Sequence, residues 1–293
     1  MRAAERRGAG APPIEASDSD QARAAGRRGA GAPPAEASDS DTTRVAVDSS
    51  TPAGAPEPGA IDRSAHRAPL RVIERPRIAF RGWSRLSGKI RVVDRGKDRQ
   101  LMVHGEILSI YPLDGNWTRM RREYWWKALA FIELPRRPSA LLIGLGGGTQ
   151  IHLLHRRASP RQITVIERDP VIVRVASEWF GLDRIGKLEI VCADAETAIT
   201  GLARAGRQFD YVMEDVTYAD EPEVALPKLL AMVPLVTPRG SLVINRHRHG
   251  DPKPMARTLR LYFRDVKIRR VRRTGENTLI CCSRPLVSRA ADA

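Results

Sequence analysis

The chain has 293 residues, a net charge of +15 and an apolar fraction of 42%, which suffices for the packed core of one large domain or two smaller ones. No apolar run approaches the roughly 20 residues of a membrane-spanning helix, and the arginine-containing start of the chain lacks the apolar segment of a signal peptide. The cysteines Cys192, Cys281 and Cys282 match neither a metal-ligand spacing nor a disulfide framework, so we expect a cytoplasmic protein without a membrane partner.

Residues 1–68 predict a disordered, low-complexity tail. Residues 2–20 and 23–41 repeat one sequence with a period of 21 and match at 17 of 19 positions. Because the copies are nearly devoid of large apolar side chains, they cannot stack into a solenoid. A misassigned translation start would explain this segment equally well. The tail has a net charge of −1, so residues 69–293 carry the whole positive charge of the chain.

Residues 69–134 predict a small β-rich region followed by a helix. From about residue 88, the segment 89–110 reads as short strands with turns at DRGKD and near Gly105, which predicts an antiparallel sheet. The segment RREYWWKALAFIEL then has helical spacing and ends before Pro135. Its arginines alternate with aromatic residues, as in single-strand nucleic-acid binders, but we favour an amphipathic helix that covers a site.

Residues 135–293 alternate between strands and helices, which predicts an α/β domain with a mostly parallel, doubly wound sheet of the Rossmann-like type. Asp169 and Pro170 are typical of a helix start, and Gly181 of a helix end. The last two strands, near 264–270 and 277–283, are joined by too short a connection for a crossover and should be antiparallel. The other expected elements are strand 140–144, helix 149–157, strand 162–167, helix 170–180, strand 188–192, helix 195–204, strand 209–214, a helical stretch broken by Pro227 and Pro234, strand 241–245 and a helix near 253–262.

Three acidic residues follow the expected strands where each apolar run ends. These are Glu167, Asp194 and Asp215, after the second, third and fourth strands. Ligands of doubly wound sheets bind at the carboxyl ends of the strands, so the three carboxylates should lie together. Glu167 can accept both hydroxyls of a ribose, and Asp194 is placed to accept from an adenine amino group.

The segment LLIGLGGGTQ, residues 141–150, predicts a buried strand that meets a nucleotide ligand through a glycine loop. A dinucleotide site would carry the pattern G-x-G-x-x-G. Gly144 and Gly146 fit this pattern, but Thr149 stands in the position of the third glycine. A dinucleotide is therefore the less favoured ligand.

Five segments, ALLIGLGGGTQIHLLHR, TVIERDPVIVRVASEWFGL, VCADAETAI, FDYVMED and VTPRGSLVIN, together resemble the spermidine synthase-like proteins. These are polyamine aminopropyltransferases and their relatives on the class I methyltransferase fold, and the resemblance covers roughly residues 88–283. It implies a transferase whose donor is S-adenosylmethionine or its decarboxylated form. The residues implied are Gly144, Leu145, Gly146, Gly147, Gly148, Thr149, Glu167, Asp194 and Ala195 for the donor, Asp215 for catalysis, and Tyr124 and Tyr218 for the substrate.

The chain departs from the aminopropyltransferase pattern at three positions. Thr149 replaces an aspartate of the glycine loop, Tyr218 replaces a second acidic residue after Asp215, and Leu108 replaces a glutamine. The family residues serve a donor tail and an acceptor that are both cationic amines. Their loss removes negative charge where two ammonium groups would have to be neutralised.

These departures favour methyl transfer from intact S-adenosylmethionine to a small-molecule acceptor. Thr149 is expected at a helix start, where it could cap the helix or bind the donor carboxylate. Direct displacement beside sulfur mainly requires positioning, and Asp215 could take the proton of the nucleophile. The alternatives are a polyamine aminopropyltransferase of polyamine biosynthesis, and a basic RNA-binding or scaffold protein with a degenerate nucleotide site. A homodimer is left open.

Other chemistry finds little support in the sequence. His152 and His155 lie three residues apart on an expected helix, and His247 and His249 alternate along a strand end. None has a cysteine or carboxylate partner at ligand spacing, so we expect no metal. The basic surface leaves nucleic acid open as a partner, but we do not favour it, since arginine-rich surfaces are usually only solvated.

Overall fold

The computed structural model describes residues 75–216, 220–247, 251–271 and 277–286. The tail predicted for residues 1–68 lies outside them, as do Tyr218 and His249. No helix in the described ranges is both long and apolar enough to cross a membrane.

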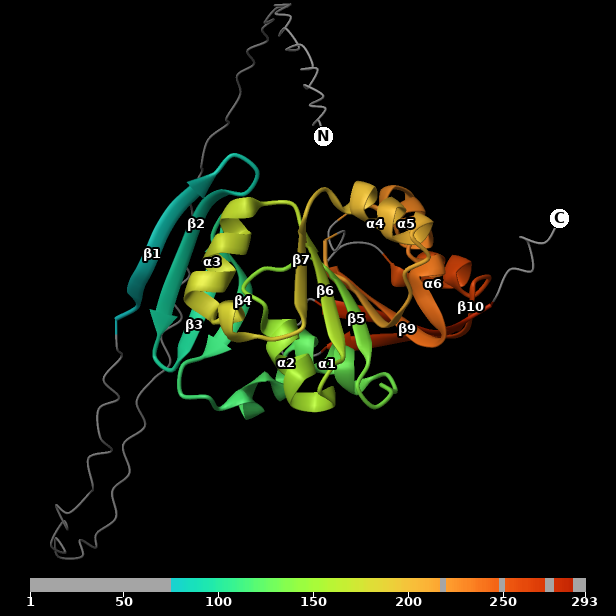
Figure 1. The fold of residues 1–293 in the computed structure, drawn as a ribbon, viewed down its shortest axis with the longest axis horizontal. Helices are drawn as coiled ribbons and strands as arrows, with labels where there is room; N and C mark the ends of the chain where they lie inside the picture. Colours follow the sequence, from blue (N-terminus) through green and yellow to red (C-terminus); the bar gives the residue numbers. More distant parts are fainter. Residues whose placement is uncertain (1–74, 217–219, 248–250, 272–276, 287–293) are drawn as a thin grey trace, which may run out of the picture. The chain divides into compact units, whose positions relative to one another are not determined.

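A four-stranded antiparallel sheet opens the described chain, with its strands in sequence order (Figure 1). Strands β2 to β4 confirm the predicted small sheet, but the first strand was missed because its arginines obscure the alternating pattern. On one side of the sheet, Ile90 and Leu101 pack against Ile172, Val175 and Phe180 of helix α3 (Pro170–Phe180). The strands are β1 (Arg77–Ser84), β2 (Gly88–Arg95), β3 (Asp98–Val103) and β4 (Glu106–Pro112).

The helix predicted for RREYWWKALAFIEL is confirmed only in its middle part, and its predicted limits are wrong. A 3-10 turn, η1 (Trp117–Arg122), precedes a short helix, α1 (Tyr124–Ala130). Glu123 separates them because its backbone is extended, with φ −84° and ψ 156°. The break turns Tyr124 and Trp125 toward the carboxyl ends of the central strands, where both line a cavity.

The second sheet has seven strands in the order β10-β11-β9-β8-β5-β6-β7. Strands β7, β6, β5, β8 and β9 run parallel to one another, and β11 is antiparallel to both β9 and β10. The α/β Rossmann-like architecture and the antiparallel last strand are thereby confirmed. The strands are β5 (Ser139–Ile143), β6 (Gln162–Glu167), β7 (Leu188–Cys192), β8 (Phe209–Glu214), β9 (Val236–His247), β10 (Phe263–Val271) and β11 (Asn277–Pro285).

Helices cover both faces of this sheet. Helices α1 and α2 pack on one face, whereas α4, α5 and α6 pack on the other. Cys281 belongs to the first core and Cys282 to the second, which confirms that they pack on opposite faces. The helices are α2 (Thr149–Ala158), α3 (Pro170–Phe180), α4 (Ala195–Arg204), α5 (Pro222–Leu230) and α6 (Pro252–Leu259), with 3-10 turns η2 (Leu182–Arg184) and η3 (Val233–Leu235).

The predicted limits of α3 are confirmed to the residue, and the caps explain why. The Asp169 carboxylate accepts from the Val171 N–H, Pro170 occupies the first turn, and Gly181 ends the helix with φ +69°. Prolines interrupt the later helical stretch less than predicted, since α5 contains Pro227 and continues to Leu230.

Candidate functional site

Two adjoining cavities lie where the parallel strands end. The first has a volume of about 340 Å³ and is bounded by the glycine loop, α1, and the ends of β8 and β9. The second has a volume of about 270 Å³ and lies against the starts of the loops after β6 and β7. Residues that line both cavities are Gly144, Glu167, Arg168 and Val216. A ligand of two parts could therefore span this edge of the sheet.

The glycine loop after β5 requires its glycines for different reasons. Gly144 has φ +95°, and a Cβ there would lie 3.3 Å from the carbonyl oxygen of Asp215. Gly146 has φ +51°, and a Cβ there would lie 2.7 Å from the Ser109 Oγ. Gly144 therefore lets two strand ends approach at the cavity wall, whereas Gly146 lets the small sheet close over the loop.

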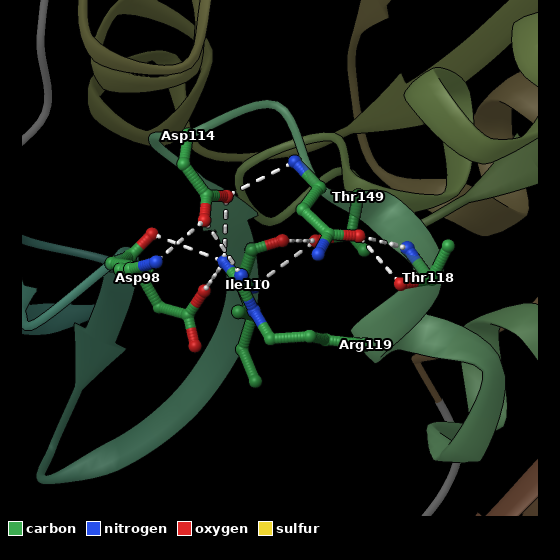
Figure 2. A network of polar contacts seen from close by, with 8 residues as sticks. Asp98, Ile110, Asp114, Thr118, Arg119 and Thr149 are labelled. Carbon is green, nitrogen blue, oxygen red and sulfur yellow. Dashed lines mark hydrogen bonds and ion pairs between the residues drawn. The ribbon is translucent and has the colours of Figure 1, made fainter.

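Strand β4 of the small sheet is bonded directly to this loop. Ser109 Oγ accepts from the Gly147 N–H at 2.6 Å. The Thr149 hydroxyl donates to the Ile110 carbonyl at 2.9 Å and accepts from the Ile110 N–H at 3.1 Å. Figure 2 shows Thr149 bonded to Ile110, and it also draws Arg119, which bonds Asp98 and Asp114. The small sheet and the nucleotide-type loop are thus one packed unit.

This arrangement corrects the role predicted for Thr149. The cap of α2 is Gly148, in the left-handed conformation with φ +78°, and Thr149 is the first helical residue. Thr149 is only 3% exposed, lines neither of the two cavities, and uses its hydroxyl on the backbone of β4. Its side chain therefore serves as a link between the two sheets, and its hydroxyl is bonded to the backbone of β4.

Glu167 stands at the junction of the two cavities. Its Oε2 accepts from the Leu145 N–H at 3.1 Å, and its Oε1 accepts from the Asp169 N–H at 3.0 Å. Burial raises the pKa of Glu167, while these two backbone N–H groups lower it. Each carboxylate oxygen keeps further lone-pair capacity for a ligand hydroxyl. The predicted position is confirmed, and the ribose role stays a prediction.

Asp194 and Ala195 lie in the second cavity, as the sequence placed them. Asp194 also caps α4, because its Oδ1 accepts from the N–H groups of Glu196 and Thr197. Apolar side chains complete this cavity and give it walls suited to a flat ring; they include Ile143, Ile166, Ile199 and Met232. The residues present therefore fit an adenosine group that spans Glu167 and Asp194.

Asp215 is the centre of a polar network in the first cavity. The Tyr124 hydroxyl donates to its Oδ2 at 2.6 Å, and the Asn245 amide donates to its Oδ1 at 2.7 Å. The Asn277 amide in turn donates to Asn245 Oδ1 at 3.0 Å. Four elements (α1, the end of β8, β9 and β11) thus hold one carboxylate.

Burial raises the pKa of Asp215 from 3.8 to about 7, and the neighbouring Glu214 carboxylate adds to this, while the Tyr124 and Asn245 hydrogen bonds oppose it. A carboxylate with such a pKa can both accept and release a proton near neutral pH. Perturbed groups of this kind cluster at functional sites.

Asn245 and Asn277 were missed in the sequence. Asn245 sits near the end of β9, so the strand-end rule that found Glu167 and Asp215 could have found it. Asn277 begins β11 and pairs with His247 at the same edge, because β11 runs antiparallel to β9. His247 also lines the first cavity.

The remaining predicted residues divide between the cavity and the core. Leu108 lines the first cavity and gives that wall an apolar side chain. His152 is bonded to the Phe180 carbonyl at 2.8 Å, and burial lowers its pKa to about 4, so it is a packing residue. Among the described residues, no cluster of histidine, cysteine and carboxylate side chains has the arrangement of a metal site.

Known proteins similar to this chain fall into two groups. The eEF1A lysine and N-terminal methyltransferase of Danio rerio is 34% identical over 117 residues, which are 36% of this chain and 17% of that protein. A probable spermidine synthase from Corynebacterium glutamicum superposes with a TM-score of 0.55 at 17% identity, over 71% of this chain and 79% of that one. A spermidine synthase in complex with the transition-state analogue AdoDATO gives a TM-score of 0.54 at 15% identity, over 71% and 72%. No protein-family model matches the chain.

The fold is that of the class I methyltransferases. The spermidine synthases share this fold, which confirms the architecture implied by the resemblance. The similarity in sequence is instead to proteins named as methyltransferases, and the chain spans only 17% of the length of the Danio rerio protein. The predicted polyamine chemistry is therefore supported by similarity of fold and not by similarity of sequence.

Proposed function

We propose that the chain is an S-adenosylmethionine-dependent methyltransferase that methylates an amine nitrogen of a protein or peptide. The observation that carries this proposal is the Asp215 carboxylate, which has a pKa near 7 and is held by Tyr124 and Asn245 beside the glycine loop. The relative from Danio rerio, whose name specifies lysine and N-terminal methylation, supports the choice of acceptor. This acceptor replaces the small molecule predicted from the sequence.

The chemistry of amine methylation suits Asp215. An amine must be neutral to attack the methyl carbon, so the N–C bond forms from the nitrogen lone pair as the S–C bond breaks, and S-adenosylhomocysteine leaves. Asp215 would accept the proton that the ammonium must lose, and it could do so near neutral pH because its pKa is raised to about 7. Tyr124 and Asn245 would keep the carboxylate in place for this transfer.

The other predicted residues bind either the methyl donor or the acceptor in this proposal. Glu167 would bind the ribose, Asp194 and Ala195 would border the adenine, and the loop from Gly144 to Gly148 would let the nucleoside approach the backbone. Tyr124 would contact the acceptor. The substrate role predicted for Tyr218 falls outside the described residues.

The cavity lining disfavours aminopropyl transfer. Its acidic residues are Glu106, Glu167 and Asp215, of which Glu167 is bonded to two backbone N–H groups and Asp215 has a pKa near 7. A diamine acceptor and an amine-tailed donor together bring several positive charges. Arg168 adds a further positive charge at the junction of the cavities, and the apolar Leu108 contributes no negative charge.

A matched pair of peptides tests the proposal. One peptide carries a free α-amino group and one lysine, and the other is the same peptide with both amines acetylated. We expect mass spectrometry to find a methyl group on the free peptide alone, in step with release of S-adenosylhomocysteine, and Asp215→Asn to slow transfer by about 10²–10⁴. Aminopropylation of putrescine from the decarboxylated donor, without methylation of any peptide, would contradict the proposal.

A further inference from the structure

Gln150, the second residue of α2, lines the first cavity and has a buried side chain. The residue is 8% exposed and lines the cavity beside Tyr124 and Asp215. Its Nε2 donates to the Tyr211 hydroxyl at 2.8 Å. Its Oε1 is buried and has no hydrogen-bond partner among the described residues. Native proteins rarely bury an acceptor without a donor, so the oxygen calls for an explanation.

Tyr211 holds one end of the Gln150 amide. It is fully buried on β8, and its hydroxyl holds the Nε2 of Gln150. Side chains alternate along a strand, so Tyr211, Met213 and Asp215 belong to the same face of the sheet. Met213 and Asp215 line the same cavity as Gln150. Gln150 and Asp215 therefore each bring an acceptor, an amide oxygen and a carboxylate, to the lining of one cavity.

Two acceptors in the lining of one cavity favour a ligand group with more than one hydrogen-bond donor. A carboxylate would be repelled by both, and a hydroxyl could serve only one of them with its single proton. A primary ammonium group has three N–H donors and can bond both at once. A bond from a charged donor is also stronger than one between neutral groups.

We propose that Gln150 Oε1 is a binding site for a primary ammonium group, a subsite that rests on the proposed methyltransferase function. Two sources share this chemistry. One is the α-ammonium of the donor, and the other is the amine of the acceptor. In either case Gln150 orients an ammonium beside Asp215.

Calorimetry on the full chain tests this subsite with three ligands. S-adenosylmethionine carries the donor ammonium, 5′-methylthioadenosine is the same nucleoside without it, and n-butylammonium added to the complex with S-adenosylhomocysteine imitates the acceptor. The variants are Gln150→Leu, which removes the acceptor, and Gln150→Glu, which keeps an oxygen there. Gln100→Leu is the matched control, because the Oε1 of Gln100 is also buried and unpartnered but Gln100 does not line the cavity.

We expect Gln150→Leu to lower the affinity for one of the two ammonium ligands about tenfold or more, and to leave the affinity for 5′-methylthioadenosine unchanged. Weaker binding of S-adenosylmethionine would identify the donor ammonium as the group that Gln150 binds. Weaker binding of n-butylammonium would identify the acceptor amine. Gln150→Glu should bind the same ligand at least as well as the wild type, and Gln100→Leu should bind all three normally.

Two results would overturn the inference. One is unchanged binding of both ammonium ligands by Gln150→Leu. The other is a loss in Gln150→Glu as large as that in Gln150→Leu, which would mean that the amide presents its N–H groups to the ligand. Gln150→Glu is nearly isosteric, so it decides the matter alone if Gln150→Leu does not fold. If the wild type binds neither nucleoside, the proposed function itself fails, which is a different outcome from a wild type that binds and variants that match it.

Discussion

Replacing Asp215 by asparagine should make the fold more stable at alkaline pH and leave it nearly unchanged at acidic pH. The folded chain raises the pKa of this carboxyl from 3.8 to about 7, so the folded state binds a proton that the unfolded state has already released. The stability contributed by protonated Asp215 is therefore fully present below about pH 4 and is lost as the pH rises through 7. Asparagine has no charge to bury and does not lose stability in this window.

The size of the effect follows from the shift. One pKa unit corresponds to about 1.4 kcal/mol, so a shift of about three units costs up to about 4 kcal/mol once Asp215 is ionised. Asparagine keeps most of the network, since its oxygen can still accept from Asn245 and its amide can donate to the Tyr124 hydroxyl. We expect the variant to gain about 2–4 kcal/mol relative to the wild type between pH 4 and pH 8.

Urea unfolding at a series of pH values between 4 and 8 measures this difference. Asp94→Asn is the control, because Arg99 lowers the pKa of Asp94 below its ordinary value, so both its folded and unfolded pKa values lie below the window. Its effect on the free energy of unfolding should stay constant over the same range. A flat difference for Asp215→Asn as well would refute the raised pKa and, with it, the assignment of Asp215 as the base.

Three further predictions concern the other contacts of the site. Thr149→Val should destabilise the fold by about 1–3 kcal/mol in urea unfolding, because it leaves the Ile110 N–H and carbonyl without their partner, while Thr149→Ser should retain most of the stability. Tyr124→Phe removes a hydrogen bond that lowers the pKa of Asp215, so the pH at which the rate of methyl transfer rises should move to a higher value. An unshifted pH profile would show that Tyr124 does not act on Asp215. Glu167→Ala should lower the affinity for S-adenosylmethionine at least tenfold in calorimetry, because ribose contacts are lost. An affinity equal to that of the wild type would exclude Glu167 from the donor site.

Local signals explain why most of the seven-stranded sheet and its helices could be predicted from the sequence. Buried parallel strands read as continuous apolar runs, and the Asp169–Pro170 start and Gly181 end of α3 are written in residue types that favour those backbone conformations. Strand β1 lacks such a signal, since its alternating residues include arginines. Only its pairing with β2 identifies it as a strand.

The sequence could predict the site residues that are placed by the ends of strands. It could not predict those whose role depends on a hydrogen-bond partner far away in the sequence. Glu167 and Asp215 follow apolar runs, so their place at the edge of the sheet follows from the parallel topology. Thr149 and Gln150 occupy a predicted helix start, but their partners, Ile110 and Tyr211, come from distant parts of the chain. No local pattern reveals that β4 closes over the glycine loop.

Calorimetric titration with S-adenosylmethionine, its decarboxylated form and NAD, side by side on the full chain, tests the central claim most directly. We expect S-adenosylmethionine to bind, the decarboxylated donor to bind more weakly, and NAD to give no heat. The reason is a cavity edge built for one adenosine, with Glu167 between Asp194 and Asp215. Few free carboxylates remain to offset the higher net positive charge of the decarboxylated donor, which lacks the carboxylate of S-adenosylmethionine. Tighter binding of the decarboxylated donor, or no binding of either donor, would contradict the assignment of this chain as an S-adenosylmethionine-dependent methyltransferase.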